Sequence, residues 1–493
     1  MNTNELINGK IGKTLYSGSL SILISMHLPQ EIPIPPVIQT LQLITNPTRF
    51  LDRCASMAGD IFTTRVMGWN SPPIVFLSSP DAIAQVFAIP AGKLDFQTPT
   101  YVFRPLFGDN SLVLQPTYEH SRQRNLLLPS FHGEKIRAYG EIICQITQEA
   151  ISTWPLGREV KMQSMMPDIT LQIILQVVFG ISPGENYQKL RRLLTSLLHD
   201  ITTPWYSSLF FFPSLQKDWG KFSPWGNYLY RKKQIDDLIY QEIRQRRQQL
   251  NSTANFQRKS EKQDILSLLL SARDSAGKSL NNTELKDQLI SLLLLGYETT
   301  SGVLCWLFHL VHSHPQVKTK LLQELNSLNP IPTPEEITQL PYLDVVCKET
   351  MRLHPIALIC TPRIVKEPVQ IDKYQFSPST VLIPCIYLAH RRSHAYNSPT
   401  KYIPERFLER KFSSFEYLPF GGGYRGCIGS AFSMYELKLI FATIMLNYQL
   451  ELLHRKTVYP QRRGITIVPS GGVPMRIKSK SSSVSVSTIS QKV

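Results

Sequence analysis

The stretch Phe420-Gly421-Gly422-Gly423-Tyr424-Arg425-Gly426-Cys427-Ile428-Gly429 carries one thiol at the end of a glycine-rich loop, with an arginine two residues before it. Apolar residues then recur at Ala431, Met434, Leu437 and Phe441, which predicts a buried helix directly after the loop. Glycines let the backbone curl close to the sulfur, and the N-terminal end of a helix favours a thiolate. The pattern is typical of a cysteine that binds a metal, although a lone glycine-rich turn fits a small buried cysteine equally well.

A second segment, from Asn281 to Leu310, has the strongest helical periodicity in the chain, and Asn281 with Glu284 is a suitable N-terminal cap. Its leucine-rich run is interrupted by Gly296-Tyr297-Glu298-Thr299-Thr300-Ser301, which contains an acid and three hydroxyl groups. A buried helix tolerates such groups only where they find partners. Two interpretations remain: threonines that bond to carbonyls one turn earlier, or an acid and a hydroxyl that serve a reaction.

Charged pairs with helical spacing occur at two further places. These are Glu349 with Arg352, followed later by Arg406 in Pro404-Glu405-Arg406-Phe407, and His120 with Arg124. Pro355 predicts the end of the helix that carries the first pair. Taken alone, each pair is typical of an exposed helix face.

The ten-residue loop resembles the haem-binding signature of the cytochrome P450 family, Phe-x-x-Gly-x-Arg-x-Cys-x-Gly, at every fixed position. The resemblance implies a haem b cofactor (iron protoporphyrin IX) whose iron is bound by the thiolate of Cys427, the metal ligand. It further implies that Phe420 shields the sulfur and that Arg425 pairs with a haem propionate. Gly429 leaves space for the flat cofactor.

The central helix resembles the family motif small-Gly-x-acid-Thr-Thr/Ser, which implies that Glu298 and Thr299 are catalytic. An acid beside a hydroxyl that holds water can relay the two protons that O–O cleavage requires. Leu295 departs from the family, which usually has alanine or glycine at this position. A leucine that faces the iron would narrow the space for a substrate.

The resemblance also assigns the charged pairs. His120, Arg124 and Arg363 resemble the family's cofactor-binding residues, which hold the haem propionates. Glu349, Arg352 and Arg406 resemble its ion-pair network, whose role is structural.

The implied fold is mainly α (α+β): a single-domain cytochrome P450 fold with a large helical part and a small β-rich part near the N-terminus. Ile74-Val75-Phe76-Leu77 is a short strand-like run that agrees with this fold. We expect an N-terminal extension without a transmembrane helix at 1–30, the catalytic domain at 31–478 and a disordered tail at 479–493. The polar residues 248–263 predict a surface loop.

Composition bears on location and partners. No stretch reaches the roughly 20 apolar residues of a spanning helix, and the 7 cysteines lack paired spacing, so we expect a soluble, bacterial, cytoplasmic protein without an integral membrane anchor. The net charge is +16, but no nucleic-acid-binding motif accompanies it. Since flavin and nicotinamide motifs are missing too, we expect electrons from an acidic ferredoxin or flavodoxin with an NAD(P)H reductase. The candidate contact residues are Arg122, Lys135, Arg137, Arg425 and Lys438.

The expected function is a monooxygenase that inserts one oxygen atom from O2 into a C–H bond of an apolar substrate, such as a fatty acid, alkane or terpenoid. An aromatic region would form the lid of the substrate pocket, although such runs are more often core. It comprises Trp205 to Pro213, Trp219, Phe222, Trp225 and Tyr228. Two alternatives remain open: a haem-thiolate isomerase, dehydratase or peroxygenase without a redox partner, and a non-catalytic haem sensor or carrier.

Overall fold

The computed structural model describes residues 28–480, except 67, 69–70, 181–183, 204–205, 207–208, 211–214, 252–263 and 454–456. Its α-helices are α2 (Pro36–Thr45), α3 (Pro47–Ala58), α4 (Pro80–Ala88), α5 (Arg104–Phe107), α6 (Thr117–Leu127), α7 (Glu134–Arg137), α8 (Gly140–Ser152), α9 (Met162–Phe179), α10 (Glu185–Ile201), α12 (Pro224–Asn251), α13 (Ile265–Ser271), α14 (Asn282–Ser313), α15 (Pro315–Asn326), α16 (Pro334–Thr338), α17 (Pro341–Leu353), α18 (Ile386–Ala389), α19 (Arg406–Glu409) and α20 (Ser430–Asn447). Its strands are β1 (Ile61–Thr64), β2 (Ile74–Leu77), β3 (Leu94–Asp95), β4 (Glu159–Lys161), β5 (Arg363–Val365), β6 (Val369–Ile371), β7 (Tyr374–Phe376), β8 (Val381–Pro384), β9 (Tyr448–Leu452), β10 (Pro460–Arg463), β11 (Thr466–Pro469) and β12 (Pro474–Lys480). The mainly helical fold class is therefore confirmed.

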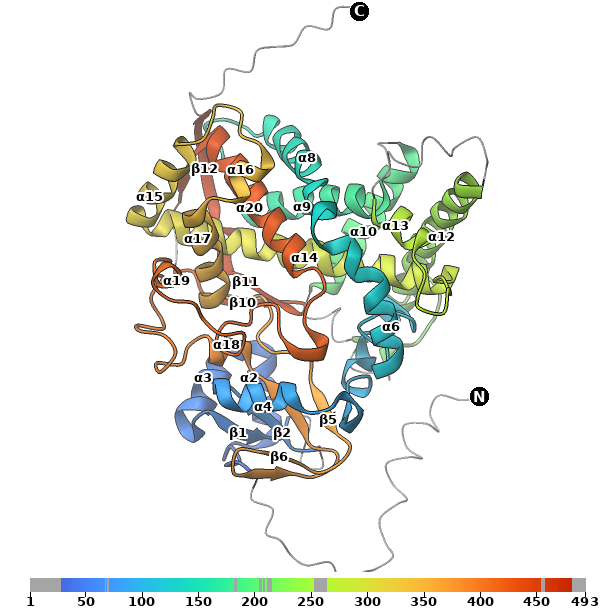
Figure 1. Cartoon of the computed structure of the whole chain (residues 1–493), viewed down its shortest axis with the longest axis vertical. Coiled ribbons are helices and arrows are strands. Elements are labelled where there is room, and N and C mark those ends of the chain that lie inside the picture. Colours follow the sequence, from blue (N-terminus) through green and yellow to red (C-terminus); the bar gives the residue numbers. More distant parts are fainter. Residues whose placement is uncertain are drawn as a thin grey trace, which may run out of the picture.

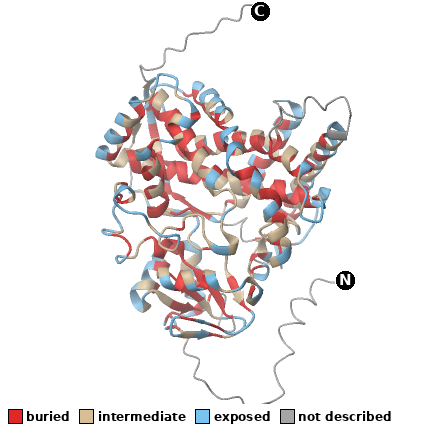
Figure 2. Ribbon diagram, in the orientation of Figure 1, coloured by how far each residue is buried: buried red, intermediate tan, exposed pale blue. Residues whose placement is uncertain are grey.

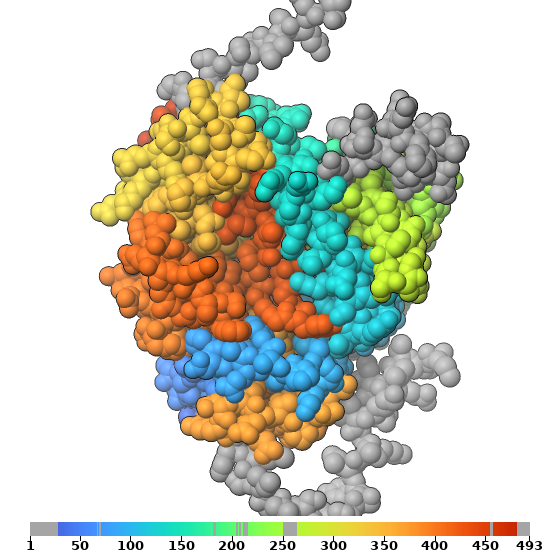
Figure 3. Space-filling view, in the orientation of Figure 1, coloured from blue at the N-terminus to red at the C-terminus, as the bar shows by residue number. Residues whose placement is uncertain are grey.

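The largest sheet lies at one end of the molecule, beside α2, α3 and α4 (Figure 1), and has the strand order β1-β2-β8-β5-β3. The strand expected at Ile74–Leu77 is β2, which pairs antiparallel with β1 and parallel with β8. The sheet is thus only partly N-terminal, because β5 and β8 come from residues 363–384. In Figure 3 this orange segment lies against the blue N-terminal residues. The smaller sheets are β4-β12-β9, β10-β11 and β6-β7.

Helix α14 is the centre of the helical part, which Figure 2 shows as mostly buried. The predicted cap is confirmed: the Asn281 side chain accepts from the N–H of Glu284, and the Glu284 carboxylate accepts from the N–H of Asn281. The helix packs against α9, α12, α17, α20 and β11. It alone among the described helices is long and apolar enough to cross a membrane, but most of it is buried inside the protein. Its apolar composition is therefore explained by its place in the core.

Two predicted boundaries differ from the structure. Helix α12 continues through Asn251, so the surface loop expected at 248–263 begins as helix, and 252–263 lie outside the described residues. Strand β12 extends through Lys480, because Ser479 and Lys480 pair with β9. The segment expected as a tail at 479–493 therefore begins within a sheet.

Part of the aromatic region expected as a lid belongs to the core. Trp225 and Tyr228 are buried on α12, with ring centroids 5.1 Å apart, and Phe210 packs edge-on against both. The exposed aromatic residues are Trp219 and Phe222. Most of the segment from Trp205 to Pro213 lies outside the described residues.

Candidate active site

The loop that carries the cysteine contains a short 3-10 turn, Gly423–Arg425, and leads into α20. Gly421 and Gly423 have φ values of 68° and 63°, which favour glycine. At Gly422 the reason is a close approach, since a Cβ there would collide with the ring of Phe87. Gly426 has an ordinary φ of −58°. Unusual backbone conformations therefore explain Gly421 and Gly423, but not Gly422 and Gly426.

Cys427 lies two residues before Gly429, the N-cap of α20, as the sequence predicts. Its N–H donates to the carbonyl of Phe420 at 2.9 Å, which closes the loop. Burial raises the pKa of the Cys427 thiol, while a hydrogen bond from the Gly429 backbone and the charge of Arg124 lower it. The net effect favours the protonated thiol, contrary to the expectation from the helix dipole alone. A metal that binds here must therefore displace the proton.

Two arginines meet the loop from different elements. Arg124, on α6, donates to the carbonyl of Gly426 at 2.8 Å. Arg425 donates to the carbonyls of Leu112, at 3.2 Å, and Gln115. Its Nε is buried without a hydrogen-bond partner, and burial lowers the pKa of Arg425 to about 10. Within the described part of the chain, neither guanidinium forms an ion pair with a carboxylate.

His120 and Arg363 are buried close to these arginines. Burial and the charges of Arg425 and Arg124 lower the pKa of His120 to about 3, so the imidazole is neutral, and its Nδ1 lacks a hydrogen-bond partner. Arg363 lies over the ring of Phe87, 4.9 Å from its centroid. Burial lowers the pKa of Arg363 to about 10, and its charge acts on Arg425. The site thus concentrates positive charge, and among the described residues none of these cations forms an ion pair with a carboxylate, although the more distant Asp95 acts on Arg425.

This arrangement fits the haem expected from the sequence. Buried cations without counter-charges are costly, and the two propionates of a haem would supply them. The Cys427 side chain is exposed although protein surrounds it closely, so it opens onto space inside the molecule. A Cβ on Gly429 would meet no atom within 4 Å, which leaves room for a flat group beside the thiol. The structure brings together Cys427, Phe420, Gly429, Arg425, Arg124, His120 and Arg363.

Glu298 and Thr299 lie next to each other on α14, but their side chains bond to other groups. The Thr299 hydroxyl donates to the carbonyl of Leu295 at 2.7 Å, one turn earlier. The Glu298 carboxylate accepts from the hydroxyl of Thr466, on β11, at 3.0 Å. Burial raises the pKa of Glu298 to about 7, while Thr466 and Arg463 lower it. Glu298 can therefore exchange a proton near neutral pH.

A partly buried stripe runs along this otherwise buried helix. It consists of Leu292, Leu295, Gly296 and Thr299. Their spacing places them on one face of α14. The adjacent residue Thr300 contacts Ser433 and Glu436 in the first turns of α20, so the stripe lies near the cysteine loop.

Glu436, a buried acid on α20, was not predicted from the sequence. Its side chain is 2% exposed and accepts a hydrogen bond from Thr300 at 3.2 Å. Burial raises the pKa of Glu436 to about 8. The available signal was that Glu436 is the only acid between Ile428 and Asn447, an apolar stretch. A buried acid could be inferred from that pattern, but its partner on another helix could not.

We predict that Glu436→Gln changes the pH dependence of stability. Because the pKa of Glu436 is raised from 4.5 to about 8, the folded protein holds a proton between these pH values that the unfolded chain releases. The free energy of unfolding therefore falls as pH rises through this window, by at most about 1.4 kcal/mol per pH unit. The glutamine variant should gain stability relative to the parent protein from pH 5 to pH 8, as measured by chemical denaturation. Glu409→Gln, at an exposed position, is the control; equal slopes for all three proteins would contradict the prediction.

The predicted ion-pair network is confirmed. Arg352 binds Glu349 through two bonds, from Nε at 2.6 Å and from Nη2 at 2.8 Å, and Arg406 Nε donates to the same carboxylate at 3.1 Å. Glu349 and Arg352 are fully buried. Arg352 also donates to three backbone carbonyls between 390 and 401. The network thereby fixes the segment that leads to the cysteine loop.

Three of the residues expected on a basic docking face are unsuitable. Lys438 is buried and forms an ion pair with Asp344 at 2.6 Å. Arg122 forms ion pairs with Glu119, at 2.9 Å, and with Glu284. Arg425 points into the site described above. The remaining candidates are Arg137, which is exposed, and Lys135, which is partly exposed.

Comparisons with known proteins agree with this site. The family model described as cytochrome P450 matches residues 28–473. Cytochrome P450 135B1 of Mycobacterium tuberculosis is 30% identical over 455 residues, which cover 92% of each chain, and cytochrome P450 138 of the same organism is 28% identical over 91% of this chain and 95% of its own. Among solved structures, the retinoic-acid-bound cyanobacterial CYP120A1 superposes with a TM-score of 0.77 at 24% identity, covering 92% of this chain and 100% of its own. The cytochrome P450DA haem domain gives a TM-score of 0.79 at 20% identity, over 92% and 99% of the chains.

Proposed function

Since the chain belongs to the cytochrome P450 family and is therefore a haem-thiolate monooxygenase, we propose that it hydroxylates an apolar substrate at a site built around Cys427. Members of this family bind haem b through a cysteine thiolate. The observation that carries the proposal is a thiol that opens onto internal space beside the buried side chains of His120 and Arg363 and the partly buried side chains of Arg124 and Arg425, none of which forms an ion pair with a carboxylate among the described residues.

In this proposal the thiolate of Cys427 would bind the iron, and Phe420 and Gly429 would border the sulfur and the macrocycle. Arg124, Arg425, Arg363 and the neutral imidazole of His120 would hold the propionates. When bound, the haem supplies dioxygen binding and reductive O–O cleavage, which the thiolate promotes.

Glu298 and Thr299 supply protons to that reaction. Glu298 has a pKa of about 7, so it takes up and releases a proton near neutral pH. The Thr299 hydrogen is committed to the carbonyl of Leu295, which leaves the Thr299 oxygen to accept a hydrogen bond from a water molecule. Thr299 thus positions the water molecule, and Glu298 replaces the protons that this water molecule gives up.

We predict that Thr299→Ala and Glu298→Gln uncouple electron consumption from product formation. Each variant loses part of the proton relay, so product should fall on the order of 100-fold per electron pair consumed, while haem content stays unchanged. The measurement compares NADPH oxidation with hydroxylated product in a reconstituted electron-transfer chain. Ser301→Ala is the matched control, because within the described ranges its hydroxyl bonds back to the carbonyl of Glu298 and to no other group. If both relay variants remain as well coupled as the control, these residues do not deliver protons.

The proposed substrates are fatty acids, alkanes or terpenoids. Leu292 and Leu295 make the partly accessible stripe on α14 apolar, and Leu295 would restrict the space above the iron to a slim chain end. The test is a titration of the haem protein with a panel of these compounds, followed by the low-spin to high-spin change of the iron. Leu295→Ala should bind bulkier compounds than the parent protein. An identical ranking for both proteins would contradict the role of Leu295.

Bacterial members of this family typically take electrons from a redox partner. We propose an acidic ferredoxin or flavodoxin with an NAD(P)H reductase, and a cytoplasmic location. The net charge of +16 supports an acidic partner, and steering by charge predicts an association rate that falls as salt increases. Stopped-flow reduction at several ionic strengths tests this choice of partner, since a rate independent of salt would speak against it.

A further inference from the structure

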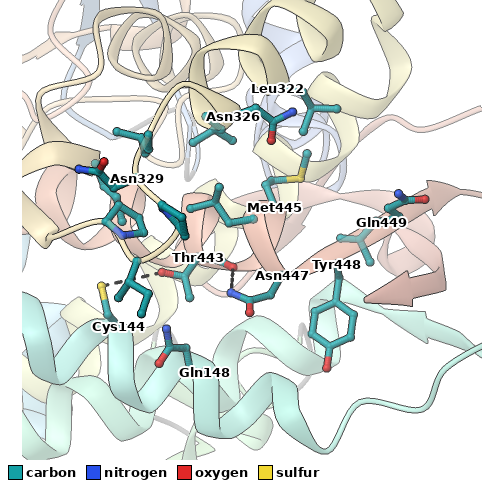
Figure 4. Close-up of a pocket in the computed structure, with 18 of the residues that line it drawn as sticks. Cys144, Gln148, Leu322, Asn326, Asn329, Thr443, Met445, Asn447, Tyr448 and Gln449 are labelled. Atoms are coloured by element: carbon teal, nitrogen blue, oxygen red, sulfur yellow. Dashed lines mark hydrogen bonds between the residues drawn. The ribbon is translucent and has the colours of Figure 1, made fainter. Parts of the chain in front are cut away.

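A cavity of about 880 Å³ lies at the end of α20 that is remote from the cysteine loop. Figure 4 shows Cys144 and Gln148 of α8 on one side, Leu322 and Asn326 of α15 on the other, and the end of α20 between them. From Ser430 to Met445 the helix rises roughly 20 Å, so this cavity is separate from the site around Cys427.

About half of the wall of the cavity is apolar, and amide side chains such as Gln148 and Asn447 contribute much of the rest. Its apolar part includes Leu322 and Leu325 of α15, Met445 and Leu446 at the end of α20, and Ile331. Ile331 is 85% exposed, which is unusual for a large aliphatic side chain and marks the connection between α15 and α16 as an apolar rim. The volume is within the range of cavities that bind small molecules.

Two ammonium groups line the same cavity. Lys318 donates to the carbonyl of Leu450 at 3.0 Å and forms no ion pair with a carboxylate in the described ranges. Burial and the nearby charge of Lys478 lower the pKa of Lys318. Lys478 forms an ion pair with Glu451 at 3.5 Å, but the same carboxylate also forms an ion pair with Arg476 at 3.6 Å. The carboxylate of Glu451 therefore faces three cations, Lys318, Arg476 and Lys478, and the cavity keeps an excess of positive charge.

From this combination we propose that the cavity binds an apolar carboxylate, with the carboxylate between Lys318 and Lys478 and the apolar body along α15 and the end of α20. An anion at this point relieves the repulsion between the partly buried ammonium group of Lys318 and the exposed ammonium group of Lys478. A nucleotide fits less well, because Tyr448 is the one aromatic residue in the wall and its hydroxyl donates to the carbonyl of Ile151. The proposal does not depend on which substrate the haem site hydroxylates.

The test uses the haem protein with its iron saturated by imidazole, so that the haem site does not contribute. Dodecanoate with a terminal diazirine is bound, irradiated and mapped by mass spectrometry, and its affinity is measured by calorimetry. We expect saturable labelling of residues 322–332 or 443–450. Lys318→Met and Lys478→Met should each weaken dodecanoate binding about 10-fold, while the binding of dodecanol stays unchanged.

Lys320→Met is the matched control, since Lys320 lies on the same helix but pairs with Glu405 outside the cavity. The methionine variants remove a charge from a partly buried and an exposed position and keep the aliphatic stem, so they should fold. Labelling confined to other segments would overturn the proposal. Equal dodecanoate affinity in the parent, Lys318→Met and Lys320→Met proteins would overturn it too. Failure of the haem-site predictions would change neither the labelling pattern nor the affinity for dodecanoate.

Discussion

Replacing Cys427 by serine is expected to abolish the strongly red-shifted Soret band that reduced, carbon-monoxide-treated protein of this family shows, together with hydroxylation. The band and the promotion of O–O cleavage both depend on electron donation from a thiolate. A serine hydroxyl at the same position is a harder and far less acidic ligand, which binds haem iron weakly. The measurement is the carbon monoxide difference spectrum of purified protein at matched haem content.

The control for this prediction is Cys360→Ser. Cys360 is a second thiol against the same loop, since its Sγ would lie 3.7 Å from a Cβ on Gly421. Burial raises the pKa of Cys360 to about 11, so it is a poor source of thiolate. This variant should keep the band. A Cys427→Ser protein that keeps it, or a Cys360→Ser protein that loses it, would move the metal ligand away from position 427.

The second large effect is expected for Arg352→Ala. This substitution leaves Glu349 as a fully buried carboxylate with half of its ion pairs, and it removes three bonds to backbone carbonyls. Breaking a buried pair in this way typically costs about 3–5 kcal/mol. We expect a corresponding loss in the free energy of unfolding by denaturant, and a protein that retains haem poorly. Arg352→Lys should recover only part of the lost free energy of unfolding, because a lysine cannot bind both oxygens of the Glu349 carboxylate as the arginine does.

The structural change caused by Arg352→Ala should reach the cysteine loop through His390. The ring Nδ1 of His390 lies 3.2 Å from the carbonyl of Arg352, and its Nε2 accepts from the N–H of Leu418 at 3.0 Å. Leu418 in turn accepts from the N–H of Gly421. Arg410→Ala is the control, since Arg410 pairs with Glu416 at the surface of the same region, where a pair is worth about 0–1 kcal/mol. Equal destabilisation by both alanine variants would show that burial of the network does not matter.

The features that the sequence predicted well are local. The cap at Asn281, the strand at Ile74 and the start of α20 depend on neighbouring residues, so their patterns are visible without a structure. The role of the cysteine loop was predicted from its resemblance to the cytochrome P450 signature. The ion-pair network at Glu349 was predicted from a resemblance to the same family. Neither could be derived from spacing alone.

The features that the sequence did not predict depend on contacts between distant segments. Lys438 looked like a surface charge, but α16 and α17 cover it. The partner of Glu298 is Thr466, on a strand far along the chain, rather than the adjacent Thr299. Glu436 and Thr300 likewise meet only because α20 packs on α14. In each case the deciding contact comes from a segment that is far away in the sequence.

The parallel pairing of β2 with β8 has a consequence for biosynthesis. Ile74 pairs with Val381, a separation of roughly 300 residues. At about 5–20 residues per second, a ribosome needs on the order of 15–60 s to make that stretch. During this time the hairpin β1-β2 has an unpaired edge, which can recruit strands from other chains. Nascent chains should therefore need chaperone protection until β8 emerges, and fragments that end before it should aggregate.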